Sequence, residues 1–285
     1  MLEKQKKLII DKDIFRGTST SKLKEFAENY FLILPQVLYY ECITANERRE
    51  KLLDRFRMII LAGGYICPTC NDILRWEAKN LFPYGSLIDL EEVAEVKRVF
   101  EVNDRPYNPE HITKLQYNVL EFVGNIRSNT ESFNEQLILE DPELLSEVRK
   151  WDSSRASKYE RFRKWAELVD TNDIHTAACH CLRGLARELD KYCLSDEWVS
   201  WEYLRLMLIH FYEKTFLTHK GAKFSEHGIE HDLQDIKYVL LLSRADGLLT
   251  KDNELIKPLA KAVFPEKDVF SNLEEVPDTY KCYWK

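Results

Sequence analysis

Short runs composed only of apolar residues constrain the fold of this chain more than any other feature. Leu8–Ile10 and Phe31–Leu34 form two such runs near the start, and Leu248-Leu249, followed by Thr250, forms a third near the end. A strand that is buried on both faces of a parallel sheet has an uninterrupted apolar run, whereas a strand with one solvated face alternates. Each run is followed by a segment with helical periodicity, so the two ends of the chain predict an α/β fold with a parallel sheet.

The segments after these runs have the apolar spacing of helices. Pro35 is expected to open one long helix that carries Glu41, because proline is favoured at the first helical position. A later apolar stripe that starts at Leu233 predicts a helix with Asp232 and Asp235 on its first turn. Two further strands are predicted at Tyr65–Cys67 and Val269–Phe270, which brings the expected sheet to about five strands.

The middle of the chain has a different character from its ends. Residues 103–227 are predicted to be helical, and they separate residues 1–102 from residues 228–285. The clearest apolar stripe consists of Trp198, Trp201, Leu204, Leu208 and Phe211. Such rings can stack on nucleic-acid bases, but filling a helical core is their far commoner role. We therefore predict an N-terminal and a C-terminal part of one α/β domain, interrupted by an all-helical insert or cap.

Composition excludes several classes of protein. Hydrophobic residues make up 45% of the 285 residues and charged residues 31%, which is typical of a globular protein. No run approaches the roughly 18 apolar residues of a membrane span, and the charged start does not resemble a signal peptide. Seven cysteines, an odd number, fit a reducing cytoplasmic location. The net charge of −7 argues against nucleic-acid binding over the whole surface, but it is compatible with a local basic patch.

Acidic side chains follow two of the predicted strands directly. Asp11 follows the first strand and Asp252 follows the Leu248–Thr250 strand. Ligands of open parallel sheets bind outside the carboxyl ends of the strands, where the strand order reverses. If these two strands are neighbours at that point, both carboxylates face one crevice. The expected helix N-terminus favours the charges of Asp232 and Asp235, and Glu41 adds a fifth acid. Oxygen ligands of this kind suit Mg²⁺ or Mn²⁺, which then activates water for attack on a phosphodiester. A helix cap or a turn remains the commoner role of any single strand-end aspartate.

The same segments resemble the acidic motifs of PIN-domain nucleases. Ile10–Phe15 resembles the family's opening strand motif, and Pro35–Glu41 resembles its second acidic motif. Asp232–Val239 and Leu248–Asp252 resemble the third and fourth motifs. The resemblance implies a PIN-like three-layer fold and an endonuclease that cleaves RNA or other single-stranded nucleic acid with Mg²⁺ or Mn²⁺. The chain departs from the family in the length of its helical insert, which is far longer than the family's usual helical cap.

The resemblance also assigns roles to individual residues. It implies that Asp11, Glu41, Asp235 and Asp252 are catalytic metal ligands or water organisers. Thr250 is then a polar residue that assists the metal ligands. Asp13 and Asp232 are expected to contact the ligands rather than the metal ion. His231 adjoins Asp232, so it is a candidate for contact with the scissile phosphate, although a surface role is commoner. Family members commonly dimerise, so a homodimer or another protein partner is also expected.

Two other sequence patterns, a basic stretch and a cysteine pair, each have a functional and a structural interpretation. A basic, aromatic-rich stretch is a candidate phosphate-binding surface, although a solvated helix face explains it slightly better. Its cations are Arg155, Lys158, Arg161, Arg163 and Lys164. Cys67 and Cys70 have a zinc-type spacing, but buried free thiols are the default for a single such pair. Candidates for the remaining zinc ligands are His175, Cys179 and Cys181.

Two other functions compete with the nuclease. Asp11 and Asp13 after an apolar strand also resemble the opening motif of haloacid-dehalogenase-type phosphatases, which implies Asp11 as nucleophile and Asp13 as general acid/base. That family needs a later serine or threonine, a lysine and an acid pair, whereas Thr250, Lys251 and Asp252 are adjacent. The second alternative is a PIN-like nucleic-acid-binding or scaffold module without turnover, which the presence of all four expected acids disfavours.

Overall fold

The sheet of this protein is parallel throughout, as the apolar runs predict. The computed structural model describes residues 5–45, 48–88, 90–102, 156–171, 195–219 and 221–282. Within these residues, five strands pair in the order β3-β2-β1-β4-β5. The strands are β1 Leu8–Ile10, β2 Leu32–Pro35, β3 Tyr65–Cys67, β4 Gly247–Leu249 and β5 Asp268–Phe270. The central strands β2, β1 and β4 are buried along their whole length, which explains their uninterrupted apolar runs.

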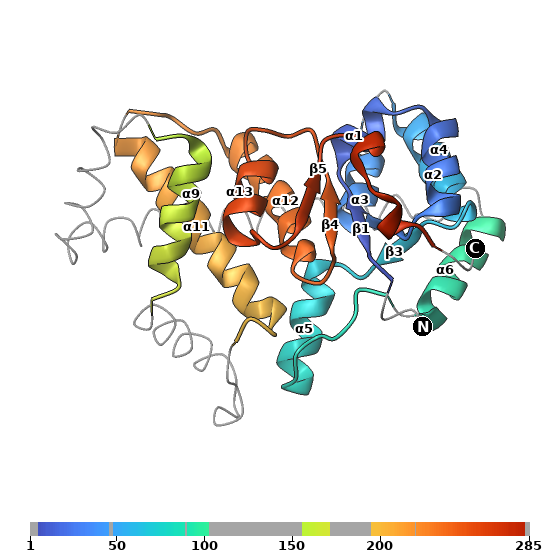
Figure 1. Cartoon of the computed structure of the whole chain (residues 1–285), viewed down its shortest axis with the longest axis horizontal. Coiled ribbons are helices and arrows are strands. Elements are labelled where there is room, and N and C mark those ends of the chain that lie inside the picture. Colours follow the sequence, from blue (N-terminus) through green and yellow to red (C-terminus); the bar gives the residue numbers. More distant parts are fainter. Residues whose placement is uncertain are drawn as a thin grey trace.

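Helices lie on both sides of the strands, so the α/β fold has three layers. α2 and α4 lie on one side, and α9, α11, α12 and α13 lie on the other (Figure 1). The N-terminal helices are α1 Lys12–Gly17, α2 Thr20–Asn29, α3 Gln36–Thr44, α4 Arg49–Leu61, α5 Cys70–Asn80 and α6 Leu90–Val102. The later helices are α9 Lys158–Val169, α11 Val199–His219, α12 Glu226–Leu242 and α13 Ile256–Val263. Two short 3₁₀ helices, Leu273–Glu275 and Asp278–Tyr280, follow β5. None of the described helices is both long and apolar enough to cross a membrane.

Two of the predicted helices have different bounds in the structure. The single long helix expected after Pro35 is wrong, because the chain leaves helical geometry at Ala45 and α4 begins at Arg49. The predicted start of the later helix is also wrong: Ser225 accepts a hydrogen bond from the Gly228 N–H, and α12 begins at Glu226. Asp232 and Asp235 therefore lie well inside α12, where the helix N-terminus does not stabilise their charges.

The described part of the predicted insert shares one hydrophobic core with the sheet. α9 packs against α13 and α11, and α11 also packs against α12 and α5. The rings of Trp165, Trp198 and Trp201 are buried in the same cluster as the strand residues. The interpretation of the aromatic stripe as core is therefore confirmed for Trp198, Trp201 and Phe211, and their rings are not exposed for base stacking.

Candidate active site

The strand order reverses between β1 and β4, which are neighbours in the sheet. The chain passes from β1 outward to β2 and β3, and then returns to place β4 on the other side of β1. Ile10 pairs with Leu249, so Asp11 and Thr250 leave the sheet side by side. The Asp11 N–H donates to the Leu249 carbonyl oxygen over 3.0 Å. The sequence prediction that these two strand ends meet at one switch point is thus confirmed.

Asp11 is a buried carboxylate with partners on both oxygens. Its Oδ1 accepts the Ile14 N–H over 3.0 Å and caps α1, and its Oδ2 accepts the Thr250 hydroxyl. Burial raises the pKa of Asp11 to about 7; the hydrogen bonds from Ile14 and Thr250 oppose the rise, and the charges of Asp13 and Asp252 add to it. Without a nearby cation, ionised Asp11 is therefore poorly stabilised.

Thr250 links Asp11 to Asp252. Its hydroxyl donates to Asp11 and accepts the Asp252 N–H over 3.0 Å. Asp252 Oδ1 accepts the N–H groups of Glu254 and Leu255 over 2.6 and 2.7 Å, which fixes the turn before α13. Oδ2 of Asp252 makes no hydrogen bond to any residue that the structure describes. The role of helper for Thr250 thus has a geometric basis, and one oxygen of Asp252 is left for a ligand.

Asp235 completes this group from α12. Within the described part of the chain its carboxylate makes no hydrogen bond and no ion pair. Burial raises the pKa of Asp235 to about 8; Lys12 opposes the rise, and the charges of Asp252, Glu41 and Asp232 add to it. Asp235 is therefore the acid of the site that most needs an added cation.

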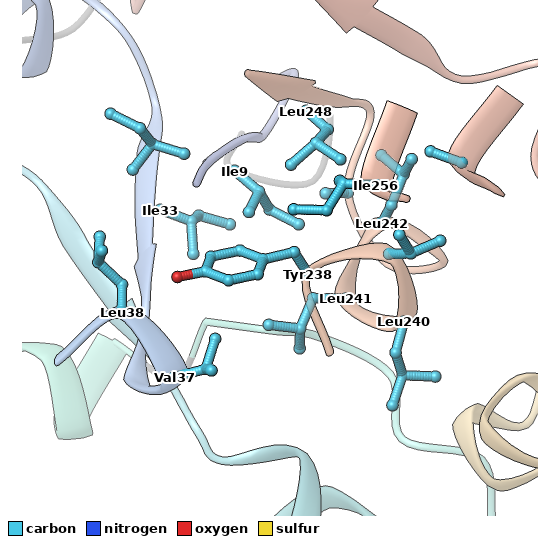
Figure 2. Packing of buried hydrophobic residues seen from close by; sticks show 14 of the residues in the cluster. Ile9, Ile33, Val37, Leu38, Tyr238, Leu240, Leu241, Leu242, Leu248 and Ile256 are labelled. Carbon is cyan, nitrogen blue, oxygen red and sulfur yellow. The ribbon is translucent and has the colours of Figure 1, made fainter. Parts of the chain in front are cut away.

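Glu41 differs from the other acids because two side chains occupy its oxygens. The Lys12 ammonium donates to Oε1 over 2.6 Å, and the Tyr238 hydroxyl donates to Oε2 over 2.6 Å. Tyr238 reaches from α12 across the core toward Ile33 and Leu38, as Figure 2 shows. Neither Lys12 nor Tyr238 was predicted from the sequence to be a site residue. The available signals were the lysine inside Asp11-Lys12-Asp13 and a tyrosine one helical turn after Asp235.

Tyr238→Phe should destabilise the protein by about 1–3 kcal/mol, because it leaves a buried carboxylate oxygen without its donor while conserving the ring. Urea unfolding monitored by circular dichroism measures the difference. Tyr203→Phe is the matched control, since its hydroxyl makes no hydrogen bond to the described residues. Equal stabilities for the two variants would show that the bond to Glu41 contributes nothing.

The predicted supporting residues lie in different surroundings. Asp13 is exposed on the first turn of α1 and interacts with Asp11 only through its charge. Asp232 is turned toward α11, where its Oδ2 accepts from His210 Nε2 over 3.0 Å and from the Lys214 ammonium. Burial alone would raise the pKa of Asp232, but these two partners hold it below its usual value. Asp232 therefore ties α12 to α11, and His231 is exposed on α12.

The predicted phosphate-binding cations fall on α9, except Arg155, which lies outside the described residues. Arg161 donates to both oxygens of the buried Glu213 and holds α9 against α11, so a phosphate contact would require breaking that ion pair. Arg163 is exposed beside Glu167, and Lys164 is half-buried. Lys158 lies 3.3 Å from Glu254, two residues after Asp252. The first turn of α9 thus borders the loop that carries Asp252.

Cys67 and Cys70 are both buried in this structure. Burial raises the pKa of Cys70 to about 11, which disfavours the thiolate that zinc needs. The other predicted zinc ligands, His175, Cys179 and Cys181, lie outside the described residues. This pair of cysteines therefore adds no evidence for a zinc site.

No protein-family model, curated protein or solved structure matches this chain. The geometry and the charge of the site are therefore the basis for proposing a function.

The donor atoms of the site fit a hard divalent cation. Asp235 and Oδ2 of Asp252 are carboxylate oxygens without hydrogen bonds from described residues, and the raised pKa of Asp235 is the response expected of an acid that lacks a cation. No three acids, histidines or cysteines among the described residues converge into a ready-made metal cage. Mg²⁺ in proteins often uses only one or two carboxylates and keeps several waters, so it does not require such a cage.

Proposed function

We propose that this protein is a metal-dependent endonuclease of the PIN-domain type that cleaves RNA. The observation that carries the proposal is the meeting of Asp11 and Thr250, at the ends of β1 and β4, with Asp235 and Asp252 as charged neighbours. Acidic side chains at the switch point of a parallel sheet lie where ligand binding is expected in such folds.

Three of the acids and Thr250 have distinct roles in this proposal. Asp235 and Asp252 hold Mg²⁺ or Mn²⁺ directly through their available oxygens, and Asp11 supports the ion from the buried strand end. Thr250 fixes the relative positions of Asp11 and Asp252. A divalent ion held by these residues would activate water for attack on the phosphodiester and would stabilise negative charge on the leaving oxygen. Because the attacking group is water, Asp11 needs no unbonded oxygen as a nucleophile, which separates this function from the phosphatase alternative.

The first turn of α9 is the proposed route of the RNA backbone into the site. Lys158 lies beside the loop of Asp252, and Arg163 projects one to two turns further along the same helix. Tyr159, between them, is partly exposed and can stack on a base. Cations that contact phosphates make binding depend on salt, so Lys158→Glu should weaken RNA binding and reduce its salt dependence.

The direct test is cleavage of labelled single-stranded RNA and DNA with Mn²⁺, Mg²⁺ or EDTA. We expect wild type to cleave RNA only with a divalent ion, and Asp11→Asn and Asp252→Asn to lose at least about 100-fold in rate. Asp54→Asn, which changes an exposed aspartate of α4, should cleave as wild type does. Metal-independent cleavage, or equal cleavage by all variants, contradicts the proposal. RNA binding without cleavage under any metal assigns the chain to the non-catalytic binding modules instead.

A further inference from the structure

Lys12 is a cation built into the acidic site. It directly follows Asp11, and only 19% of its side chain is exposed. Its ammonium lies 2.6 Å from Glu41 Oε1, and Asp235 also attracts it. A long lysine side chain normally extends its charge into water, so a partly buried ammonium among carboxylates marks a place where the fold requires positive charge.

The occupied oxygens of Glu41 limit what else can bind there. Lys12 takes Oε1 and Tyr238 takes Oε2, and the Glu41 side chain is 9% exposed. A divalent ion at Glu41 would have to displace the ammonium or stand beside it. Two like charges in contact repel each other strongly in a partly buried site.

The net charge of the four acids and Lys12 also limits the number of divalent ions that can bind. When ionised, Asp11, Glu41, Asp235 and Asp252 together with Lys12 carry three net negative charges. One divalent ion leaves a single negative charge, whereas two leave a positive one and add repulsion against Lys12. Glu41 is paired with Lys12, and Asp235 and Asp252 have the available oxygens, so a single ion belongs on the side of Asp235 and Asp252.

We propose that Lys12 takes the place of a second metal ion, so that the site binds one divalent cation and Glu41 is not a direct metal ligand. This inference rests on the proposed function, because it assumes that a divalent cation binds. It changes the role of Glu41 from metal ligand to positioning residue for Lys12. It also predicts that removal of the lysine charge frees Glu41 for a second ion.

The test is the number of Mn²⁺ ions bound per full-length chain, measured by equilibrium dialysis and by electron paramagnetic resonance of unbound Mn²⁺. We expect one ion for wild type and for Lys12→Arg, and two for Lys12→Ala. Lys12→Gln, which keeps most of the side-chain volume, replaces Lys12→Ala if that variant does not fold. Circular dichroism establishes folding for each protein, and the wild-type value requires no variant.

The outcomes separate the inference from the proposed function. Two ions on wild type, or one ion on both neutral variants, overturn the role of Lys12 and leave the nuclease proposal standing. No ion on folded wild type overturns both. A second ion in the neutral variants that disappears in Lys12→Ala plus Glu41→Gln supports the inference, because Glu41 is then its ligand.

Discussion

Asp235→Asn should abolish cleavage and at the same time make the metal-free protein more stable at pH 8. Asp235 has no hydrogen bond or ion pair with described residues, and burial together with Asp252, Glu41 and Asp232 raises its pKa to about 8. Ionised Asp235 therefore costs free energy that asparagine does not. A shift of this size corresponds to about 6 kcal/mol. Because the amide also loses hydration, a net gain of about 2–4 kcal/mol is expected.

The pH dependence of this gain has a definite sign. Asp235 is protonated in the folded protein up to about pH 8, but ionises in the unfolded chain near its usual value of 3.8. The folded state thus binds the extra proton, and wild type loses stability as pH rises from about 4 to 8. The difference between wild type and Asp235→Asn should be largest above pH 8 and should vanish below about pH 4. Urea unfolding in EDTA at several pH values measures it.

Divalent metal should reverse the order of stability. Mn²⁺ at a thousand times its dissociation constant stabilises a protein that binds it by about 4.1 kcal/mol, which exceeds the gain expected without metal, and Asp235→Asn loses that increment. Asp54→Asn should follow wild type in every measurement, since that aspartate is exposed on α4. A variant that loses activity but gains stability identifies a residue kept for function rather than for folding. If Asp235→Asn is instead less stable than wild type at pH 8 without metal, Asp235 has a structural partner and the metal-ligand role is wrong.

The sequence predicts the sheet and the place of the site because both depend on local patterns. A strand buried on both faces has to be apolar throughout, and the acids that follow β1 and β4 are visible as strand-end residues. The contacts of Glu41 with Lys12 and Tyr238 were not predictable, because they join α1, α3 and α12 across the core. The side-chain orientation of Asp232 also depends on a helix remote in sequence, since its carboxylate contacts His210 and Lys214 of α11.

The start of α12 could not be predicted from apolar periodicity, because the first residues of the helix are mostly polar. Residues Glu226–His231 include a single large apolar side chain, so the apolar stripe becomes visible only at Leu233. Ser225 nevertheless caps the helix through the Gly228 N–H. Capping is a local signal, but a serine eight residues before the stripe does not indicate by itself which helix it starts. Because the helix was predicted to start at Asp232, its N-terminus was expected to stabilise the charges of Asp232 and Asp235. In the structure these two residues lie too far from the N-terminus of α12 for that effect.

Glu77→Ala should lower the free energy of unfolding by about 3–5 kcal/mol, because Glu77 connects α5 to the start of α11. Glu77 is fully buried, and its carboxylate accepts the N–H groups of Tyr84, Val199 and Ser200 over 2.8–2.9 Å and the Ser200 hydroxyl over 2.5 Å. Alanine leaves these donors buried without an acceptor and removes the negative charge from the N-terminus of α11. Glu77→Gln keeps one acceptor oxygen, so a smaller loss is expected, and Glu167→Ala on the exposed face of α9 should unfold as wild type does.

The shape of the unfolding curve decides whether α11 belongs to a separate cap. Because α11 packs against α12, which carries Asp235, and shares the core of the sheet, Glu77→Ala should shift one cooperative transition to lower urea. Far-ultraviolet circular dichroism and tryptophan fluorescence should then give the same midpoint. An independent helical cap would produce an earlier transition seen mainly by fluorescence, since Trp165, Trp198 and Trp201 lie on or beside α9 and α11. In that case the sheet and its carboxylates would form a domain by themselves. With a single transition, α11 and the helices packed against it are part of the domain that holds Asp235.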